Sequence, residues 1–190
     1  MSQPELLKRV VEALEQANVP YMLVGSTVSS LQGQPRSTHD IDVVVQISPQ
    51  GGEQLVAAFP LPDYLLDPLA MRSAIATRKM FNLLDNVGGD KADFWVLDVD
   101  PYRQQAFSRR IRGRLAGVEV WVQAPEDTIL SKLHWAKELG GSEKQFKDAL
   151  SVYEVQFGRL DLEYLDHWAS RLGVSEDLQR IKDTAEIIEA

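Results

Sequence analysis

Two aspartates at the start of an apolar run are the sequence feature that most limits how this chain can fold. Asp40 and Asp42 flank Ile41, and a largely apolar run continues to Ile47. In a β-strand, side chains i and i+2 point to the same face, with Cα atoms roughly 6.5–7 Å apart. The two carboxylates would then share one face, and the other face would be wholly apolar. The pattern therefore predicts a strand that buries its apolar face in a core.

Two carboxylates on one face of a strand repel each other and are costly to remove from water. A divalent cation between them would relieve both costs, and carboxylate oxygens are ligands that Mg²⁺ accepts in proteins. The other interpretation places Asp40 and Asp42 at a strand edge in water, without a metal. The pair alone leaves both interpretations open.

A Gly-Ser pair ends the preceding apolar run. Tyr21–Val24 is long enough for a buried strand, and Gly25 and Ser26 follow it directly. A glycine permits close approach of a ligand, and a serine can cap a helix whose N–H groups face a phosphate. An ordinary turn between a strand and a helix would use the same two residues, so this signal is weak by itself.

A third aspartate lies inside another apolar run, residues 91–97. A carboxylate inside a buried strand requires a partner or a metal, so Asp93 is our candidate for a third functional carboxylate. Asp98 and Asp100 are the competing candidates. They stand just before Pro101, where a role in a turn is enough to explain them.

The order of the predicted elements indicates a mixed α/β fold. Predicted strands and helices are mixed up to about residue 122, and the remaining predicted elements are all helices. We expect a mixed β-sheet flanked by helices in residues 1–124, and a helical part in residues 125–190 that packs on it. Within the first part we expect a turn at residues 49–52, before a helix, and a single strand over residues 115–122.

Composition excludes several classes of protein. The chain has no cysteine, which excludes disulfides and cysteine-based zinc sites. It has no run of about 18 apolar residues that could cross a membrane, and its N-terminus lacks the apolar segment of a signal peptide. We therefore expect a cytoplasmic protein with no membrane partner. The net charge of −8 argues against a protein whose whole surface binds nucleic acid.

One segment of this acidic chain is rich in arginine, and we call these residues the arginine group. Its members are Arg103, Arg109, Arg110, Arg112 and Arg114. One interpretation is a solvated face or a hairpin edge, where the charges simply remain in water. The other is a groove for the phosphates of a nucleotide or an RNA, because guanidinium groups neutralise phosphates well.

The order of strand, Gly25-Ser26, spacer with Arg36, and Asp40-Ile41-Asp42 opening a second strand resembles the nucleotidyltransferase superfamily of the polymerase-β type. Within it, the segment VGSTVSSLQGQPRSTHDIDVVV is similar to small bacterial nucleotidyltransferases of the AbiEii/AbiGii-toxin type. The resemblance implies the nucleotidyltransferase fold. It also implies transfer of a nucleoside monophosphate from a nucleoside triphosphate, such as ATP, to a hydroxyl group.

The same resemblance implies roles for individual residues. Asp40 and Asp42 would bind two Mg²⁺ ions, and Asp93 would bind the catalytic ion and accept the proton of the acceptor hydroxyl. Gly25 and Ser26 would offer an N–H group and a hydroxyl to the triphosphate.

The predicted helical part carries a second resemblance. Residues 124–156 are similar to the family's second motif, a lysine on one helix and an aspartate on the next, and the matching residues are Lys132 and Asp148. These two would contact the nucleotide, and Lys132 and Arg36 would neutralise phosphate charge. The family has Arg-Asp where this chain has Lys147-Asp148, and lysine lacks the bidentate geometry of arginine. Lys132 and Asp148 could equally pair with each other.

Three functions stay open at this point. The first is a nucleotidyltransferase, whose acceptor is tRNA, a protein hydroxyl or a small molecule. The second is a glycosyltransferase with an Asp-x-Asp metal site, for which the chain is short and Gly25-Ser26 would have no role. The third is a non-catalytic member of the fold that binds a nucleotide or a protein, such as the cognate partner in a toxin–antitoxin pair.

Overall fold

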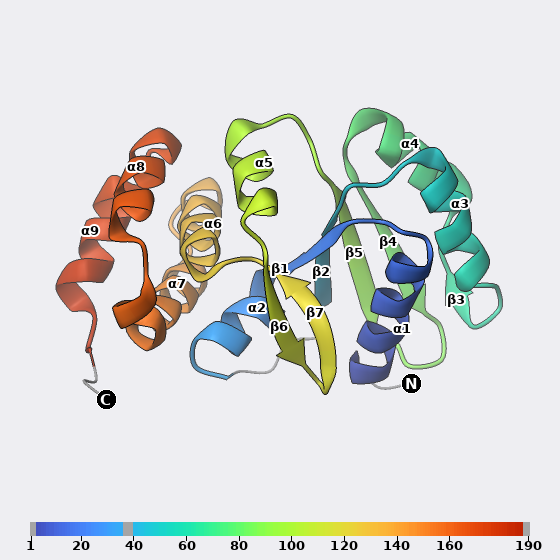
Figure 1. Cartoon of the computed structure of the whole chain (residues 1–190), viewed down its shortest axis with the longest axis horizontal. Helices are drawn as coiled ribbons and strands as arrows, with labels where there is room; N and C mark the ends of the chain where they lie inside the picture. Colours follow the sequence, from blue (N-terminus) through green and yellow to red (C-terminus); the bar gives the residue numbers. More distant parts are fainter. Residues whose placement is uncertain (1–2, 36–39, 188–190) are drawn as a thin grey trace. The chain divides into compact units, whose positions relative to one another are not determined.

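The strand that carries the aspartate pair is central in a seven-stranded sheet (Figure 1). The computed structural model describes residues 3–35 and 40–187. Across the sheet the strand order is β3-β4-β5-β2-β1-β7-β6. The strands are β1 (Tyr21–Val24), β2 (Asp40–Val45), β3 (Tyr64–Leu65), β4 (Met80–Asp85), β5 (Lys91–Val96), β6 (Ile111–Leu115) and β7 (Val118–Val122). β2 pairs in parallel with β5 and antiparallel with β1, so the sheet is mixed, as the sequence predicts.

The alternation of side chains along β2 gives the sheet one buried apolar face. Ile41, Val43 and Val45 are at most 1% exposed, whereas Asp40 is exposed and Asp42 is half-buried. On β5, Ala92 and Phe94 are buried in the same way, in register with Ile41 and Val43. The predicted division into an apolar face and a carboxylate face is therefore present.

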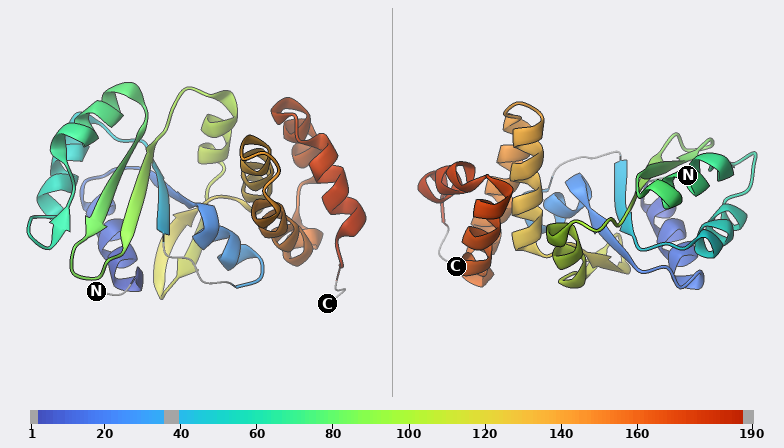
Figure 2. Two further views of the ribbon diagram at one scale, coloured as in Figure 1. Left: turned by 180° about the vertical axis from the view of Figure 1, so that it is seen from behind. Right: turned by 90° about the horizontal axis from the view of Figure 1, so that it is seen from above.

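The chain forms two compact units. The first comprises residues 3–24 and 40–122, and it contains the whole sheet. Its helices are α1 (Gln3–Gln16), α3 (Pro49–Ala58), α4 (Pro68–Thr77) and α5 (Pro101–Ser108). Within this unit, α1, α3 and α4 lie at the β3–β4–β5 half of the sheet in both Figure 1 and Figure 2. The contacts agree, because α1 packs on β5 and on α3, and α4 packs on β4.

The second unit comprises residues 25–35 and 123–187 and is helical. Its helices are α2 (Gly25–Gln32), α6 (Pro125–Glu138), α7 (Glu143–Gln156), α8 (Leu162–Leu172) and α9 (Ser175–Thr184), with a short 3₁₀ turn at Phe157–Arg159. The chain passes from the first unit to the second after Val122, and the division predicted at residue 124 stays a prediction. The helix after β1 nevertheless groups with the C-terminal helices instead of the sheet. That the helical part packs on the sheet stays a prediction.

Side-chain contacts explain why α2 belongs to the helical unit. The Gln32 side-chain amide donates to the Gln123 carbonyl at 2.6 Å, and the Gln156 amide donates to the Gln32 carbonyl at 2.8 Å. A Cβ atom added at Gly33 would lie 2.7 Å from the Ser151 hydroxyl and 3.0 Å from its backbone. Glycine is needed there because α2 approaches α7 so closely.

Within the described residues, no helix is long and apolar enough to cross a membrane.

The expected turn at residues 49–52 is wrong, because these residues begin α3. Close packing explains the two glycines instead. A Cβ atom at Gly51 would lie 2.9 Å from the Val19 side chain, and one at Gly52 would lie 2.8 Å from the Ile75 side chain. Glycine therefore lets the first turn of α3 approach its neighbours, which a local turn signal cannot reveal.

The strand expected over residues 115–122 is confirmed for Val118–Val122, which form β7, but residues 115–117 do not belong to it. β6 and β7 form an antiparallel hairpin instead, with Ala116 and Gly117 as the tight turn between them. Both residues have positive φ angles, 50° and 82°, as a two-residue hairpin turn of this kind requires. The short strand β3 was not predicted, because two residues show no alternation.

Replacing Phe94 by alanine should strongly destabilise the first unit. Phe94 is fully buried, and its ring stacks on that of Phe81 with centroids 5.0 Å apart. We expect Phe94→Ala to lower the free energy of unfolding by about 3–5 kcal/mol in urea denaturation. The control Val99→Ala removes a side chain that is 74% exposed, and it should change stability by no more than about 0.5 kcal/mol. Equal effects of the two substitutions would contradict the assigned core.

Candidate functional site

Four charged residues of β2 and β5 share one face of the sheet, which we call the acidic face. The parallel register places Asp42 opposite Asp93 and Asp40 opposite Lys91. Residues directly opposite each other on paired strands point to the same side, and paired strands lie about 4.8 Å apart. The three predicted metal ligands, Asp40, Asp42 and Asp93, are therefore on one face of two neighbouring strands.

Asp93 is the most buried member of the acidic face, at 8% exposure. One carboxylate oxygen, Oδ2, accepts a hydrogen bond from Lys91 Nζ at 2.9 Å. The other, Oδ1, is buried and has no hydrogen-bond partner among the described residues. A buried carboxylate oxygen without a partner is unfavourable. It marks a position where a cation or a proton donor would be stabilised.

Lys91 places its ammonium between two of the carboxylates. Its Nζ lies 2.9 Å from Asp93 Oδ2 and 3.6 Å from Asp40 Oδ1. The hydrogen bond to Asp93 is the main cause that raises the pKa of Lys91, and the negative charges of Asp93, Asp40 and Asp42 act in the same direction. The lysine therefore stays protonated. Asp42 has a different partner, because its Oδ1 accepts a long hydrogen bond of 3.4 Å from the Trp95 indole N–H.

The donor atoms of the acidic face suit a hard cation such as Mg²⁺. They are carboxylate oxygens on adjacent strands, and one of them is buried without a partner. Among the residues that the structure describes, no three acidic or histidine side chains lie close enough together to hold a metal ion. The positive charge that the acidic face has in this structure is the ammonium of Lys91.

The competing aspartates have local roles at the start of α5. Asp100 is the N-cap of this helix and accepts a hydrogen bond from the Arg103 backbone N–H at 2.9 Å. Asp98 pairs with the Arg103 guanidinium at 2.6 Å and accepts from the Asp100 N–H at 3.0 Å. Their positions follow from the turn before Pro101, whereas the position of Asp93 follows from the sheet.

The predicted nucleotide-binding residues of the helical unit meet around Lys132. This lysine is 4% exposed, and its Nζ lies 2.8 Å from Asp148 Oδ2, so the two form a buried ion pair. The same ammonium donates to the Ser26 hydroxyl at 3.4 Å. Ser26 stands in the first turn of α2, directly after Gly25, whose φ of 73° favours glycine.

This second cluster has the features of an anion site. The first turn of a helix presents N–H groups and the positive end of the helix dipole, and here a serine hydroxyl and a buried ammonium stand beside it. In this structure Asp148 balances the lysine charge. Arg36, the other predicted phosphate contact, lies outside the described residues, so its role stays a prediction.

Arg112 and Arg114 lie on β6, Arg109 and Arg110 follow the end of α5, and Arg103 lies in the first turn of α5. β6 is the outermost strand of the sheet on that side. The Arg112 guanidinium lies 4.1 Å from the centre of the Trp121 ring, and that of Arg110 lies 4.3 Å from the centre of the Phe107 ring. Burial lowers the pKa of Arg110. These contacts agree with a hairpin edge on which the guanidiniums stack on aromatic rings.

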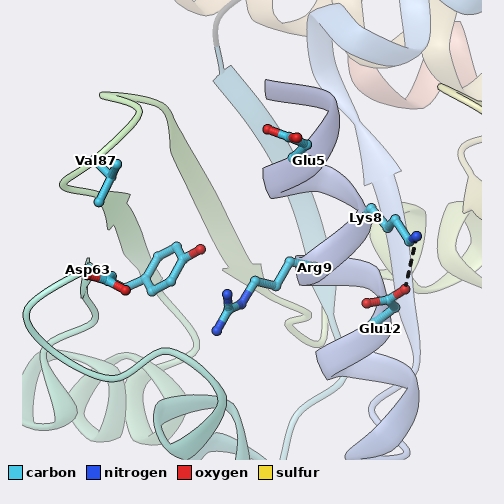
Figure 3. A pocket seen from close by; sticks show the side chains of 7 residues that line it. Glu5, Lys8, Arg9, Glu12, Asp63 and Val87 are labelled. Carbon is cyan, nitrogen blue, oxygen red and sulfur yellow. Dashed lines mark ion pairs between the residues drawn. The ribbon is translucent and has the colours of Figure 1, made fainter. Parts of the chain in front are cut away.

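A separate hollow of about 620 Å³ lies beside α1, lined by charged side chains of this helix, by Asp63 and Tyr64 at the start of β3, which we call the β3 region, and by Val87 after β4 (Figure 3). Lys8 and Glu12 form a loose ion pair of 3.9 Å at its rim. Arg9 stacks on Tyr64 at 4.7 Å and donates to the Ala58 carbonyl at 3.3 Å. The arginine thus connects α1 to the β3 region, and none of the predicted site residues lines this hollow.

Several solved structures superpose on this chain over most of its length. An antigenic nucleotidyltransferase-like protein from Paracoccidioides brasiliensis superposes with a TM-score of 0.57 at 18% identity, over 97% of this chain and 93% of that one. The antibiotic-resistance factor ANT(2'')-Ia, in complex with adenylyl-2''-tobramycin, superposes with a TM-score of 0.55 at 15% identity, over 91% and 98%. The lincosamide antibiotic adenylyltransferase LnuA with bound lincomycin gives 0.56 at 14%, over 82% and 98%. This chain has the nucleotidyltransferase fold.

The likeness concerns the fold, since no known protein family matches the sequence and neither does any curated protein. Within the nucleotidyltransferase fold, sequence reasoning identified the three aspartates of the acidic face but missed Lys91. The available signal was its spacing, because residue 91 stands two positions before Asp93 and so points to the same side of the strand.

Breaking the buried pair of Lys132 and Asp148 should cost much stability. Each single substitution, Lys132→Met or Asp148→Asn, leaves one side uncompensated, and we expect a loss of about 3–5 kcal/mol in unfolding free energy. The double variant should lose less than the sum of the two. The control Arg180→Met removes an exposed pair with Glu143, and should cost no more than about 1 kcal/mol. Additive single losses in chemical denaturation would show that the two charges do not interact.

Proposed function

We propose that this protein is a Mg²⁺-dependent nucleotidyltransferase that transfers a nucleoside monophosphate from a nucleoside triphosphate to a hydroxyl acceptor. The observation that carries the proposal is the register of β2 and β5. It sets Asp42 opposite Asp93, with Asp40 on the same face, in a sheet of the nucleotidyltransferase fold. Three carboxylates on two paired strands are an unfavourable arrangement unless a cation neutralises their charge.

In this proposal Asp40, Asp42 and Asp93 would hold the metal by moving closer together than they lie in this structure. Bound Mg²⁺ would neutralise charge at the phosphates, including the pyrophosphate that leaves as the acceptor oxygen bonds to the α-phosphorus, and would favour ionisation of the acceptor hydroxyl. Asp93 accepts the proton of that hydroxyl, for which its unpartnered Oδ1 is available. Asp42 keeps its orientation through the indole of Trp95.

The helical unit carries the groups proposed to contact phosphates. The Gly25 and Ser26 N–H groups at the start of α2 and the Ser26 hydroxyl would bind phosphate oxygens. Lys132 would contribute its ammonium to the same phosphates, and Asp148 acts as a positioning residue that holds the lysine at 2.8 Å. Arg36 would add a further positive charge.

The acceptor is proposed by class. The complexes of ANT(2'')-Ia with adenylyl-2''-tobramycin and of LnuA with lincomycin make a small-molecule hydroxyl the first candidate. A tRNA or a protein hydroxyl are the others, and the AbiEii-like motif adds a cognate toxin or antitoxin as a possible protein partner. Incubation of the protein with each labelled triphosphate and a cell extract would identify the acceptor, because the label would enter the small-molecule, RNA or protein fraction.

One observation favours a second candidate function. Lys91 already neutralises part of the acidic face, which suits a non-catalytic member of the fold that binds a nucleotide. Calorimetry with MgATP, MgCTP, MgGTP and MgUTP separates the candidates. Binding without turnover would support the non-catalytic protein, and preference for a sugar nucleotide would support a glycosyltransferase.

Asp42→Asn should abolish Mg²⁺-dependent nucleotide transfer and leave the thermal unfolding midpoint nearly unchanged. The amide keeps the shape of the side chain but removes the charge that the metal requires. The control Glu119→Gln makes the same change at an exposed carboxylate on β7 of the same sheet, and it should keep full transfer. Transfer is measured as incorporation of labelled nucleotide. A large fall in the midpoint of Asp42→Asn would show that this carboxylate is structural.

A further inference from the structure

Lys91 is the one residue of the acidic face that the proposed chemistry does not use. Its side chain is 39% exposed, and its ammonium reaches both the buried Asp93 and the exposed Asp40. Because residues 91 and 93 point to the same side of β5, the lysine cannot leave this face without changing its rotamer. The ammonium therefore stands among the carboxylates that would have to bind a divalent cation.

A lysine is suited to give up such a position. Its four-carbon stem is flexible and its ammonium is a compact point charge, so it can rotate towards water while its stem stays packed. Ion pairs that reach the surface are weak, and here Asp40 and Lys91 are both substantially exposed. Buried Asp93, in contrast, needs a positive charge at all times, since its carboxylate is only 11% exposed.

We propose that Lys91 is a built-in substitute for the divalent cation. Its ammonium stabilises Asp93 and Asp40 in the absence of metal and moves towards solvent when a divalent cation binds. The inference rests on the proposed function, since it presupposes a metal site on the acidic face. It accounts for the contacts of one ammonium with both Asp93 and Asp40, in a structure whose described residues include no three acidic side chains close enough together to hold a metal ion.

Two consequences follow from competition between the ammonium and the metal. First, metal binding must displace the pairs with Lys91, so the lysine weakens the affinity for divalent cations. Second, the lysine stabilises the fold when no metal is bound, and the metal stabilises it otherwise. The protein would thus fold without metal and become competent only above a threshold concentration of the cation.

The test measures Mn²⁺ binding by electron paramagnetic resonance, with no nucleotide present. Lys91→Met keeps the stem and removes the charge, and we expect its dissociation constant for Mn²⁺ to be about tenfold lower than that of the wild type. Lys91→Arg keeps the charge and should bind more nearly as the wild type does. The control Lys79→Met removes an exposed lysine just before β4, and it should leave Mn²⁺ binding unchanged.

Thermal unfolding gives a second readout. In EDTA, Lys91→Met should melt below the wild type, and addition of Mg²⁺ should raise its midpoint more than that of the wild type. If Lys91→Met does not fold, the side-chain ¹⁵N signal of Lys91 in the wild type tests the same point. Loss of the ion pairs on addition of Mg²⁺ should shift it, and an unchanged signal in a Mg²⁺-bound protein would overturn the inference.

The outcomes separate the inference from the proposed function. Equal Mn²⁺ affinity in the wild type and Lys91→Met, with binding lost in Asp42→Asn, would overturn the role of Lys91 and keep the metal site. Weaker binding in Lys91→Met would overturn it as well, and would make the lysine a positioning residue for the carboxylates. No Mn²⁺ binding in the wild type or in Lys91→Met would overturn both.

Discussion

The parallel pairing of β2 with β5 is the constraint on which the proposed chemistry depends. Its register brings Asp42 and Asp93 opposite each other and places Ile41 and Ala92 together in the core. A slip of one residue would send the carboxylates into the apolar face and the apolar side chains into water. Burial of the apolar face therefore holds the acidic face together, although the carboxylates themselves repel.

Each compact unit pairs one buried aspartate with a lysine. In the sheet unit, Lys91 neutralises Asp93, and in the helical unit, Lys132 neutralises Asp148 at 2.8 Å. The two pairs differ in exposure, because the side chain of Lys91 is 39% exposed whereas that of Lys132 is 5% exposed. The first pair is therefore the one that we propose to exchange for another cation, whereas the second is buried and its ammonium also contacts the Ser26 hydroxyl.

Local patterns predicted the elements well where apolar residues recur at the regular spacing of a strand or a helix. The alternation around Asp40 and Asp42 predicted β2, and the sequence also predicted helices throughout residues 125–190, where α6 and α7 lie. The failures have one physical origin. Gly51 and Gly52 permit close packing against Val19 and Ile75. Both partners are more than 20 residues away in the chain, so no local pattern indicates the contact. The hairpin β6–β7 required two positive φ angles, one of them at an alanine, which carries no such signal.

The sequence by itself determined that Asp40 and Asp42 share a face, because the side-chain period of a strand is a local property. It also determined that Asp93 needs a partner, since a carboxylate in an apolar run is costly to bury. Only the tertiary structure decided that Asp93 lies opposite Asp42, that Lys91 stands among them, and that Ser26 meets Lys132 in a separate helical unit. Strand register and helix packing join residues far apart in the chain, so no local pattern specifies them.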